Sequence, residues 1–184
     1  MTISALDENG VTALNLGALS QTLRQSCVEL MADYGLIVTP QKWLVESVDP
    51  EASLCAEVDF VGQVQGSLTL CSDRSVVLET ARGAAGLRAG APRSVSDWNS
   101  ELVNQLLGRV KNKLRARDVS VDVGVPRRLG SPAPKQRDYD VRERFDCSAG
   151  TVLLLLTASF EAGIVLGERS VDDELPSEGE LLLF

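Results

Sequence analysis

The apolar positions between Ser94 and Arg117 recur at helical spacing and predict one long amphipathic helix. At about 100° per residue these side chains fall on a single broad arc. The members of the arc are Leu102, Val103, Leu106, Leu107, Val110 and Leu114. Ser94 or Ser96 is a suitable N-cap, since its hydroxyl can accept a hydrogen bond from a free amide of the first turn. We therefore expect a helix that packs against a core along one side.

Polar residues occupy the opposite side of the same helix. Asp97, Glu101, Asn104 and Gly108 follow one another at offsets of four, three and four residues, which places them in one strip along the helix. A glycine within a helix costs about 1 kcal/mol relative to alanine, and on an outward side it adds nothing to the core. We interpret this strip as a surface that presents a carboxylate and a carboxamide to a partner, with Gly108 allowing the partner to come close.

The remaining patterns predict a mixture of helices and antiparallel strands. Helical spacing followed by Gly35 indicates a second long helix, and alternation of apolar and polar residues indicates strands. The expected elements are helices over 16–34 and 74–83, a hairpin of strands 54–61 and 67–71, a strand over 119–125 that ends at Pro126, an exposed loop after Pro126, and a hairpin of strands 139–145 and 150–160.

The two halves of the chain have similar patterns, because each has a long helix followed by a strand pair. Phe60 with the later run 66–70 parallels Phe145 with the later run 150–154. We therefore expect an α+β fold in which two pseudo-repeated α-β-β units form an antiparallel sheet, with the long amphipathic helices on one face. The expected division is a loose N-terminal lead over 1–13, a single domain over 14–166, and an acidic tail over 167–184.

Composition narrows the functional classes. The net charge of −8 and the pI of about 4.6 argue against nucleic acid as a partner, because phosphates require a basic surface. The chain has no histidine, which removes the commonest general base and metal ligand. The cysteines are Cys27, Cys55, Cys71 and Cys147, with no CxxC spacing. We expect no metal site, reduced and mostly buried thiols, no membrane segment, and a cytoplasmic protein.

The strip on the central helix resembles a known family signature. Asp97-x3-Glu101-x2-Asn104, followed later by Pro126, is similar to the [Ser/Asp]-x3-Glu-x2-Asn…Pro motif of the CheC/CheX/FliY chemotaxis phosphatases. The block ELVNQLLGRVKNKL is most similar to the CheX branch. The CheC branch carries a second copy of the motif on its first helix, and this chain lacks that copy. By element order the resemblance covers about residues 16–166 and implies a CheC/CheX-like fold.

The resemblance implies a protein phosphatase that hydrolyses the aspartyl phosphate of a CheY-like response regulator in chemotaxis or two-component signalling. Asn104 would orient the attacking water, and Glu101 would dock against a lysine of the receiver domain. Asp97, Gly108 and Pro126 would contact the partner or shape the rim. Magnesium would belong to the receiver, with no cofactor in this protein. The resemblance also implies a homodimer that pairs through strands.

Several plainer interpretations compete with this hypothesis. Glu101 and Asn104 can be a solvated helix face, Asp97 an acid that favours the helix start, and Pro126 a strand terminator. At the level of the protein, the alternatives are a non-catalytic receiver-binding adaptor, a module related to the flagellar switch proteins, or a divergent member with a different partner. The intact pair of Glu101 and Asn104 favours the phosphatase.

Overall fold

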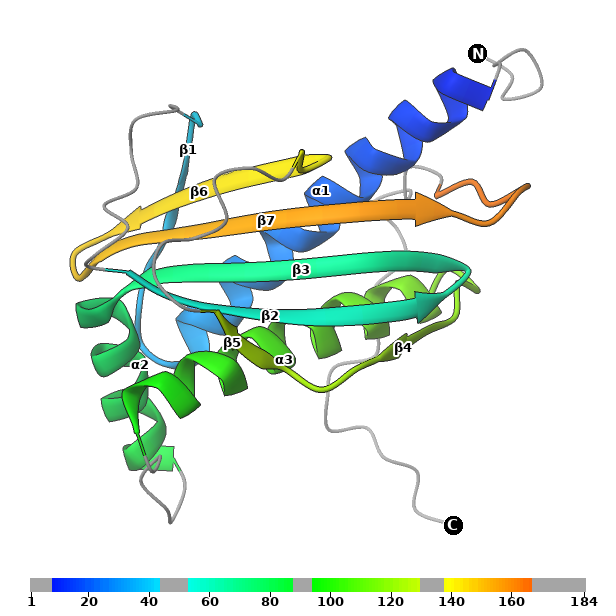
Figure 1. Cartoon of the computed structure of the whole chain (residues 1–184). Helices are drawn as coiled ribbons and strands as arrows, with labels where there is room; N and C mark the ends of the chain where they lie inside the picture. The colour runs from blue at the N-terminus through cyan, green and yellow to red at the C-terminus, as the bar shows by residue number, and fades with distance from the viewer. Residues whose placement is uncertain (1–7, 44–52, 88–93, 130–137, 167–184) are drawn as a thin grey trace, which may run out of the picture.

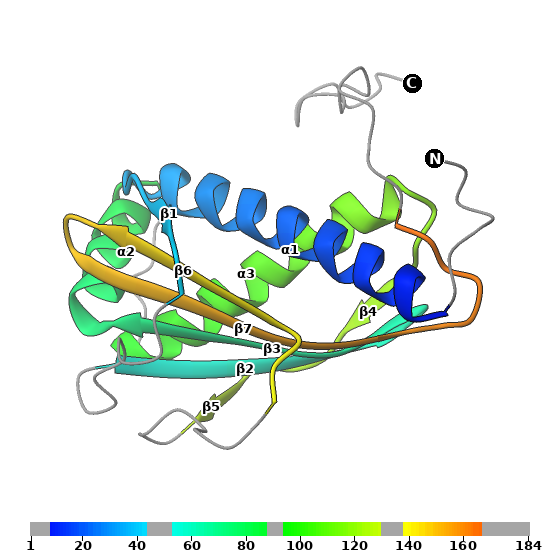
Figure 2. The same ribbon diagram turned by 90° about the horizontal axis from the view of Figure 1, so that it is seen from above.

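The structure, a computed structural model, describes residues 8–43, 53–87, 94–129 and 138–166. Two long helices lie side by side on one face of a single antiparallel sheet (Figures 1 and 2). The elements are α1 (Glu8–Asp33), β1 (Thr39–Gln41), β2 (Ser53–Gly62), β3 (Val64–Asp73), α2 (Arg74–Leu87), α3 (Val95–Arg115), β4 (Val121–Val123), β5 (Arg127–Leu129), β6 (Val141–Cys147) and β7 (Gly150–Phe160). The predicted α+β class is confirmed.

The sheet has the strand order β1-β6-β7-β3-β2-β4, and β5 also pairs with β2. Both predicted hairpins are present as β2–β3 and β6–β7, and β3 joins them by pairing with β7 at the centre. Alternate side chains of these strands point towards the helices and form an aliphatic core with α1 and α3. The internal repeat of two α-β-β units stays a prediction.

The central helix, α3, matches the expectation from its apolar pattern. Ser94 is the N-cap, and its side chain accepts a hydrogen bond from the amide of Asp97 at 3.1 Å. Every member of the predicted apolar arc is buried: Leu102, Val103, Leu106, Leu107, Val110 and Leu114. Burying an apolar side chain of this size contributes about 1.5–3 kcal/mol. The arc therefore fixes which side of α3 faces outward.

The first helix begins earlier than predicted, because α1 starts at Glu8. Residues 8–13 are therefore helical and not a loose lead. The helix also carries the buried Asn15, whose carboxamide donates to the carbonyl of Ile164 at 2.8 Å and accepts from the amide of Leu166 at 2.7 Å. These bonds tie the first half of α1 to the chain after β7. Residues 1–7 and the tail 167–184 lie outside the described residues, and the domain division stays a prediction.

The chain around Pro126 also differs from the expectation. The strand predicted over 119–125 is shorter, since β4 ends at Val123, and the predicted exposed loop begins with a strand, β5. Proline has no amide hydrogen and cannot donate to a strand ladder, so Pro126 lies in the gap between two short strands. Both strands pair with β2, and tertiary pairing of this kind is not visible in a local pattern.

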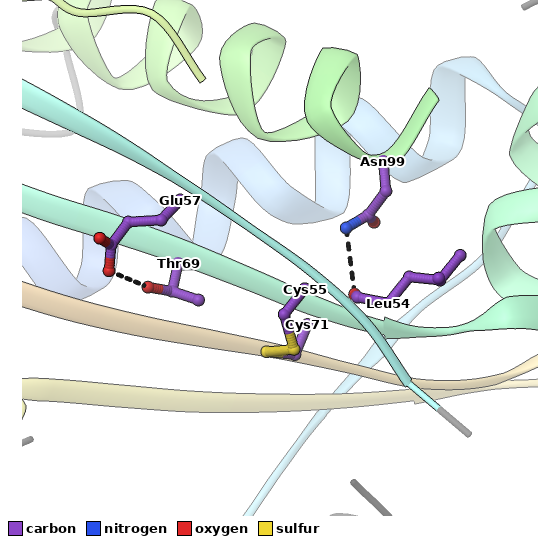
Figure 3. Close-up of a disulfide and its surroundings, with 6 residues drawn as sticks. All are labelled: Leu54, Cys55, Glu57, Thr69, Cys71 and Asn99. Carbon is purple, nitrogen blue, oxygen red and sulfur yellow. Dashed lines mark hydrogen bonds between the residues drawn. A yellow bond between two sulfur atoms is a disulfide. The ribbon is translucent and has the colours of Figure 1, made fainter. Parts of the chain in front are cut away.

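Two cysteines correct the expectation of reduced thiols. Cys55 on β2 and Cys71 on β3 are directly paired in the sheet and joined by a disulfide (Figure 3). The tight turn at Gly62 and Gln63 sets this register, so the bond follows from the hairpin geometry. Cys27 and Cys147 are free. Burial raises the pKa of the Cys27 thiol well above its ordinary value, and the nearby Glu143 and Cys147 raise it further.

Candidate functional site

The candidate site is the outward strip of α3 formed by Glu101, Asn104 and Gly108. All three residues are partly exposed, whereas the opposite side of the helix is buried. In Figure 1, α3 lies along the sheet edge formed by β2, β4 and β5. The sequence therefore placed the strip on the correct side of the helix, because the buried arc leaves only one side for it.

The carboxylate of Glu101 is held by a chain of side-chain contacts. Gln105, one turn later, donates from Nε2 to Glu101 Oε1 at 2.7 Å. The hydroxyl of Tyr34, at the end of α1, donates to Gln105 Oε1 at 2.5 Å. The Tyr34 ring packs edge-on against Trp98 with centroids 5.4 Å apart, and Trp98 Nε1 donates to Thr80 Oγ1 at 2.9 Å. This relay fixes one carboxylate oxygen and leaves the other for a partner.

Asn104 has a different environment from Glu101. Among the described residues its side chain has no hydrogen-bond partner, and it is partly exposed one turn after Glu101. A carboxamide has two donor hydrogens and an acceptor oxygen. Asn104 can therefore bind a water molecule with one end of the group and a partner with the other.

Gly108 extends the strip, and the fold does not require it. A Cβ added at Gly108 would meet nothing within 4 Å, whereas a Cβ at Gly83 would lie 2.3 Å from the carbonyl oxygen of Tyr34. Packing therefore explains the glycine at position 83 but not the glycine at position 108. The absence of a side chain at Gly108 leaves open space beside Asn104 for an approaching surface.

Asp97, the first residue of the motif, makes contacts within the chain. Its amide donates to Ser94 Oγ, and the Ser94 hydroxyl donates to its carboxylate at 2.6 Å. The same carboxylate forms an ion pair with Arg128 of β5. These contacts support the interpretation of Asp97 as an acid at the helix start, and they connect α3 to the strand that follows Pro126.

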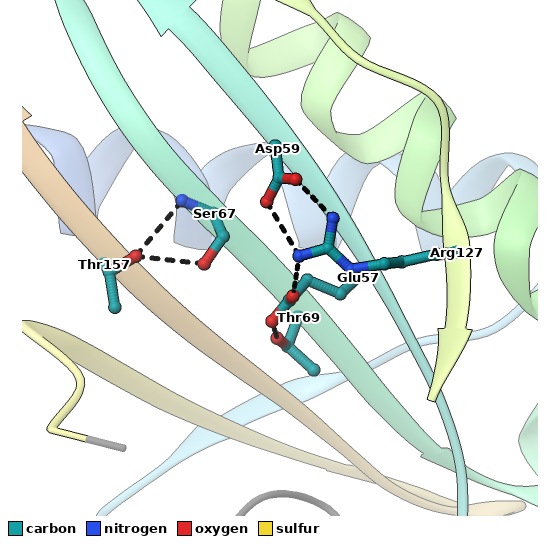
Figure 4. Close-up of polar contacts among 6 residues, drawn as sticks. All are labelled: Glu57, Asp59, Ser67, Thr69, Arg127 and Thr157. Atoms are coloured by element: carbon teal, nitrogen blue, oxygen red, sulfur yellow. Dashed lines mark hydrogen bonds and ion pairs between the residues drawn. The ribbon is translucent and has the colours of Figure 1, made fainter. Parts of the chain in front are cut away.

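The strand after Pro126 is also fixed from its other side. Arg127 pairs with Asp59 and with Glu57, a carboxylate of which only 1% is exposed (Figure 4). Thr69 Oγ1 donates to Glu57 at 2.9 Å. A buried carboxylate requires such partners, because it loses its hydration. The Asp59 hydrogen bond is the main reason why the pKa of Arg127 is raised, and Glu57 adds to the effect. Arg127 and Arg128 therefore hold β5 from opposite faces.

The strip continues into a shallow depression at the C-terminal end of α3. Its volume is about 430 Å³, and its lining includes Lys111, Arg115, Asp118 and Asp122. Lys111 Nζ lies 3.3 Å from Asp122 Oδ1. Because acids and bases alternate here, the depression has no strong preference for one sign of charge.

The described residues contain no group of three His, Cys, Asp or Glu side chains that could hold a metal ion. No described helix is long and apolar enough to cross a membrane. The candidate site therefore consists of one carboxylate, one carboxamide and the surface around them.

Sequence patterns missed three residues that support the site. Gln105 lies four residues after Glu101, and this spacing alone could have indicated the contact. Tyr34 and Arg128 come from distant elements, and no local signal connects them to α3. Their contribution becomes visible only once α1 and β5 are packed against the helix.

The fold is that of CheC/CheX-like proteins of known structure. CheX from Vibrio vulnificus has a TM-score of 0.61 and 20% identity, with 77% of this chain and 96% of that chain covered. A CheC-like superfamily protein from Shewanella sp. PV-4 has a TM-score of 0.62 and 20% identity, with 77% of this chain and 97% of that chain covered. A CheX–CheY–BeF3–Mg complex from Borrelia burgdorferi has a TM-score of 0.57 and 13% identity, with 75% of this chain and 96% of that chain covered. At these identities the likeness shows the fold.

Part of the sequence also matches a family model. The model of the chemotaxis phosphatase CheX matches residues 54–135, just under half of the chain, including α3 and Pro126. This match agrees with the resemblance to the CheX branch that the motif predicted. A comparison with curated proteins finds no match.

Proposed function

We propose that this protein hydrolyses the aspartyl phosphate of a CheY-like receiver domain in the cytoplasm. One observation carries the proposal: Glu101 and Asn104 lie one turn apart on the exposed strip of a helix whose other side is buried. Glu101 is oriented by Gln105, while Asn104 has no hydrogen-bond partner among the described residues. One group is thus fixed for docking, and the other is available for the reaction.

The chemistry of the substrate makes a strong base unnecessary. An acyl phosphate is already activated, so hydrolysis requires a water held in line with phosphorus and support for the charge of the transition state. Asn104 would hold this water. The water oxygen bonds to phosphorus, the bond from phosphorus to the aspartate oxygen breaks and leaves its electron pair on the aspartate carboxylate, and inorganic phosphate departs with the two protons of the water. Magnesium would be supplied by the receiver. This scheme requires no histidine, because Asn104 positions the water and Glu101 docks the receiver.

The partner is inferred from the family and from the acidic strip residue. A CheX of the same fold occurs in a complex with CheY, BeF3 and magnesium in Borrelia burgdorferi. The partly exposed Glu101 carboxylate is suited to a lysine on the receiver surface, and such a pair would set the register of docking. Gly108 would permit the receiver backbone to approach the helix beside Asn104.

A phosphate-release assay tests the proposal. The protein is mixed with a phosphorylated receiver from the same organism, and the loss of phosphate is compared with the spontaneous rate. We expect the wild type to accelerate the loss and the Glu101→Ala/Asn104→Ala double variant to return it to the spontaneous rate. Receiver binding without acceleration by the wild type would instead support a non-catalytic adaptor or a flagellar-switch-related module.

The resemblance also leads us to propose a homodimer. The sheet ends in short strands at both edges, β1 on one side and β4 with β5 on the other, and unpaired strand edges can join between copies. Sedimentation at micromolar concentration should give twice the chain mass of 19.8 kDa. A monomeric mass under these conditions would contradict this proposal and leave the catalytic one unchanged.

A further inference from the structure

A β-bulge separates β4 from β5 at the edge of the sheet. Val123 pairs with Phe60, and Arg127 pairs with Glu57. Two residues of β2 therefore face the three residues 124–126, so this segment contains one residue too many for regular pairing. The amide of Gly124 still donates to the carbonyl of Asp59 at 2.8 Å. The extra length is accommodated by Val125 and Pro126, which leave the ladder.

The two ends of this segment are fixed to α3 by ion pairs. Arg128 pairs with Asp97 near the start of the helix, and Asp122 pairs with Lys111 about four-fifths of the way along it. From position 97 to 111 a helix rises about 21 Å, and from position 122 to 128 an extended chain spans about 20 Å. Because the two lengths agree, the segment runs beside the strip, as Figure 1 shows for the chain between β4 and β5.

This arrangement places Val125 beside the middle of the strip. Position 125 is the midpoint of the segment, and position 104 is the midpoint of the helix between the same two ion pairs. Val125 is 87% exposed, although it is one of the few large apolar side chains on the described surface. The bulge, the proline and the ion pairs thus hold an apolar side chain in solvent at the level of Asn104 along α3.

We propose that Val125, which lies directly before the motif proline Pro126, forms an apolar rim that contacts the receiver domain beside its phosphorylated aspartate. This inference rests on the proposed function, because the occupant is the same receiver that docks on Glu101. The rim would extend the docking surface from α3 to the neighbouring bulge. Contact there would add apolar area to the interface and keep bulk water away from Asn104. Val125 would therefore contribute to affinity and specificity, and not to the reaction itself.

The test compares two equally exposed apolar residues. Val125→Ser removes the rim, whereas Ile37→Ser is the matched control: Ile37 is 86% exposed but precedes β1, at the opposite edge of the sheet. Binding is measured with a receiver activated by beryllofluoride and magnesium, and kcat and KM are measured with the phosphorylated receiver. We expect Val125→Ser to raise Kd and KM about three- to tenfold with kcat nearly unchanged, and Val125→Asp to raise them further.

The outcomes separate this proposal from the proposed function. Unchanged Kd and KM for Val125→Ser, together with a raised KM for Glu101→Ala, would overturn the rim and leave the phosphatase intact. No effect of Glu101→Ala, Asn104→Ala or Val125→Ser on phosphate release would overturn the proposed function itself. Equal losses in Val125→Ser and Ile37→Ser would also overturn the rim, because the effect would then be that of any exposed apolar residue. Thermal unfolding midpoints establish that each variant is folded.

Discussion

The two long helices on the same face of the sheet differ in what they present outward. Each has a glycine whose missing side chain faces open space, Gly17 in α1 and Gly108 in α3. Four residues before the glycine, α3 has Asn104 where α1 has Ala13; seven residues before it, α3 has Glu101 where α1 has Gly10. The same framework therefore carries a carboxylate and a carboxamide on one helix and small residues on the other.

This difference separates the requirements of packing from those of function. Both helices bury a continuous apolar side against the sheet, so both are needed for the core. On α1 the outward polar side chains serve the fold, as when Arg24 pairs with the buried Glu143 at 2.9 Å. On α3 the carboxylate and carboxamide have no such role in the core. The comparison can be tested by changing matched residues on the two helices.

The largest expected effect follows from removing the carboxamide of α3. Asn104→Ala should lower the rate of receiver dephosphorylation about 100-fold, the usual effect of losing one positioned group that acts on the transition state. Gln21→Ala, which removes an exposed carboxamide from α1, should leave the rate unchanged. Single-turnover phosphate release measures both. Full activity of Asn104→Ala would exclude the proposed mechanism.

The carboxylates of the two helices provide the next comparison. Glu101→Ala should raise KM about tenfold, because a charge pair that fixes docking is lost, and the rate at limiting receiver should fall with it. Glu29 of α1, which pairs with Lys113 at 3.0 Å, is the matched control, and Glu29→Ala should leave KM as it is. If both variants raise KM equally, the effect is general electrostatics and not docking.

The two glycines give a smaller but cleaner contrast. Gly108→Leu should raise KM several-fold by blocking the approach of the receiver, whereas Gly17→Leu should not. Neither change meets a neighbouring atom within 4 Å of the new Cβ, and replacing a helix glycine stabilises the helix by up to about 1 kcal/mol. Thermal unfolding should therefore show both variants to be at least as stable as the wild type. Normal activity of Gly108→Leu would remove the role of this glycine.

Breaking the hydrogen bond between Gln105 and Glu101 should have a still smaller effect on KM. Gln105→Met preserves the shape of the side chain but removes the donor to Glu101, so Glu101 gains rotational freedom and KM should rise about two- to threefold, the order expected for one neutral hydrogen bond. Gln105→Lys should raise KM more, because the lysine would compete for the carboxylate. An unchanged KM in both variants would show that Glu101 does not depend on Gln105.

The last prediction concerns the buried face of α1 and the pH dependence of stability. The pKa of Cys27 is raised in the folded protein by burial, so the folded state keeps the thiol proton after the unfolded chain has lost it. Stability should therefore be complete below the unfolded-state thiol pKa and fall above it by about 1.4 kcal/mol per pH unit. Urea unfolding of wild type and Cys27→Ala between pH 8 and 10 measures this slope. An equal slope in both proteins would assign it to other groups.

Local patterns were sufficient for the elements that have a strong period. The apolar arc of α3 and its Ser94 cap could be predicted because burial of one side and capping are decided within the helix. The β2–β3 hairpin followed from alternation about a short turn. The same reasoning identified Glu101 and Asn104 as candidates, since the buried arc leaves them on the only side that can meet a partner.

Contacts between distant elements were beyond those patterns. Asn15 of α1 makes hydrogen bonds to residues about 150 positions away, and β5 pairs with β2 while Arg127 and Arg128 form ion pairs on its two faces. The disulfide depends on the register of β2 and β3. The exposure of Val125 depends on a bulge that lies between two ion pairs. The sequence alone determined which residues of α3 face outward, because periodic burial is a local property. The tertiary structure decided what surrounds them, because pairing and ion pairs between remote segments form only when the chain is folded.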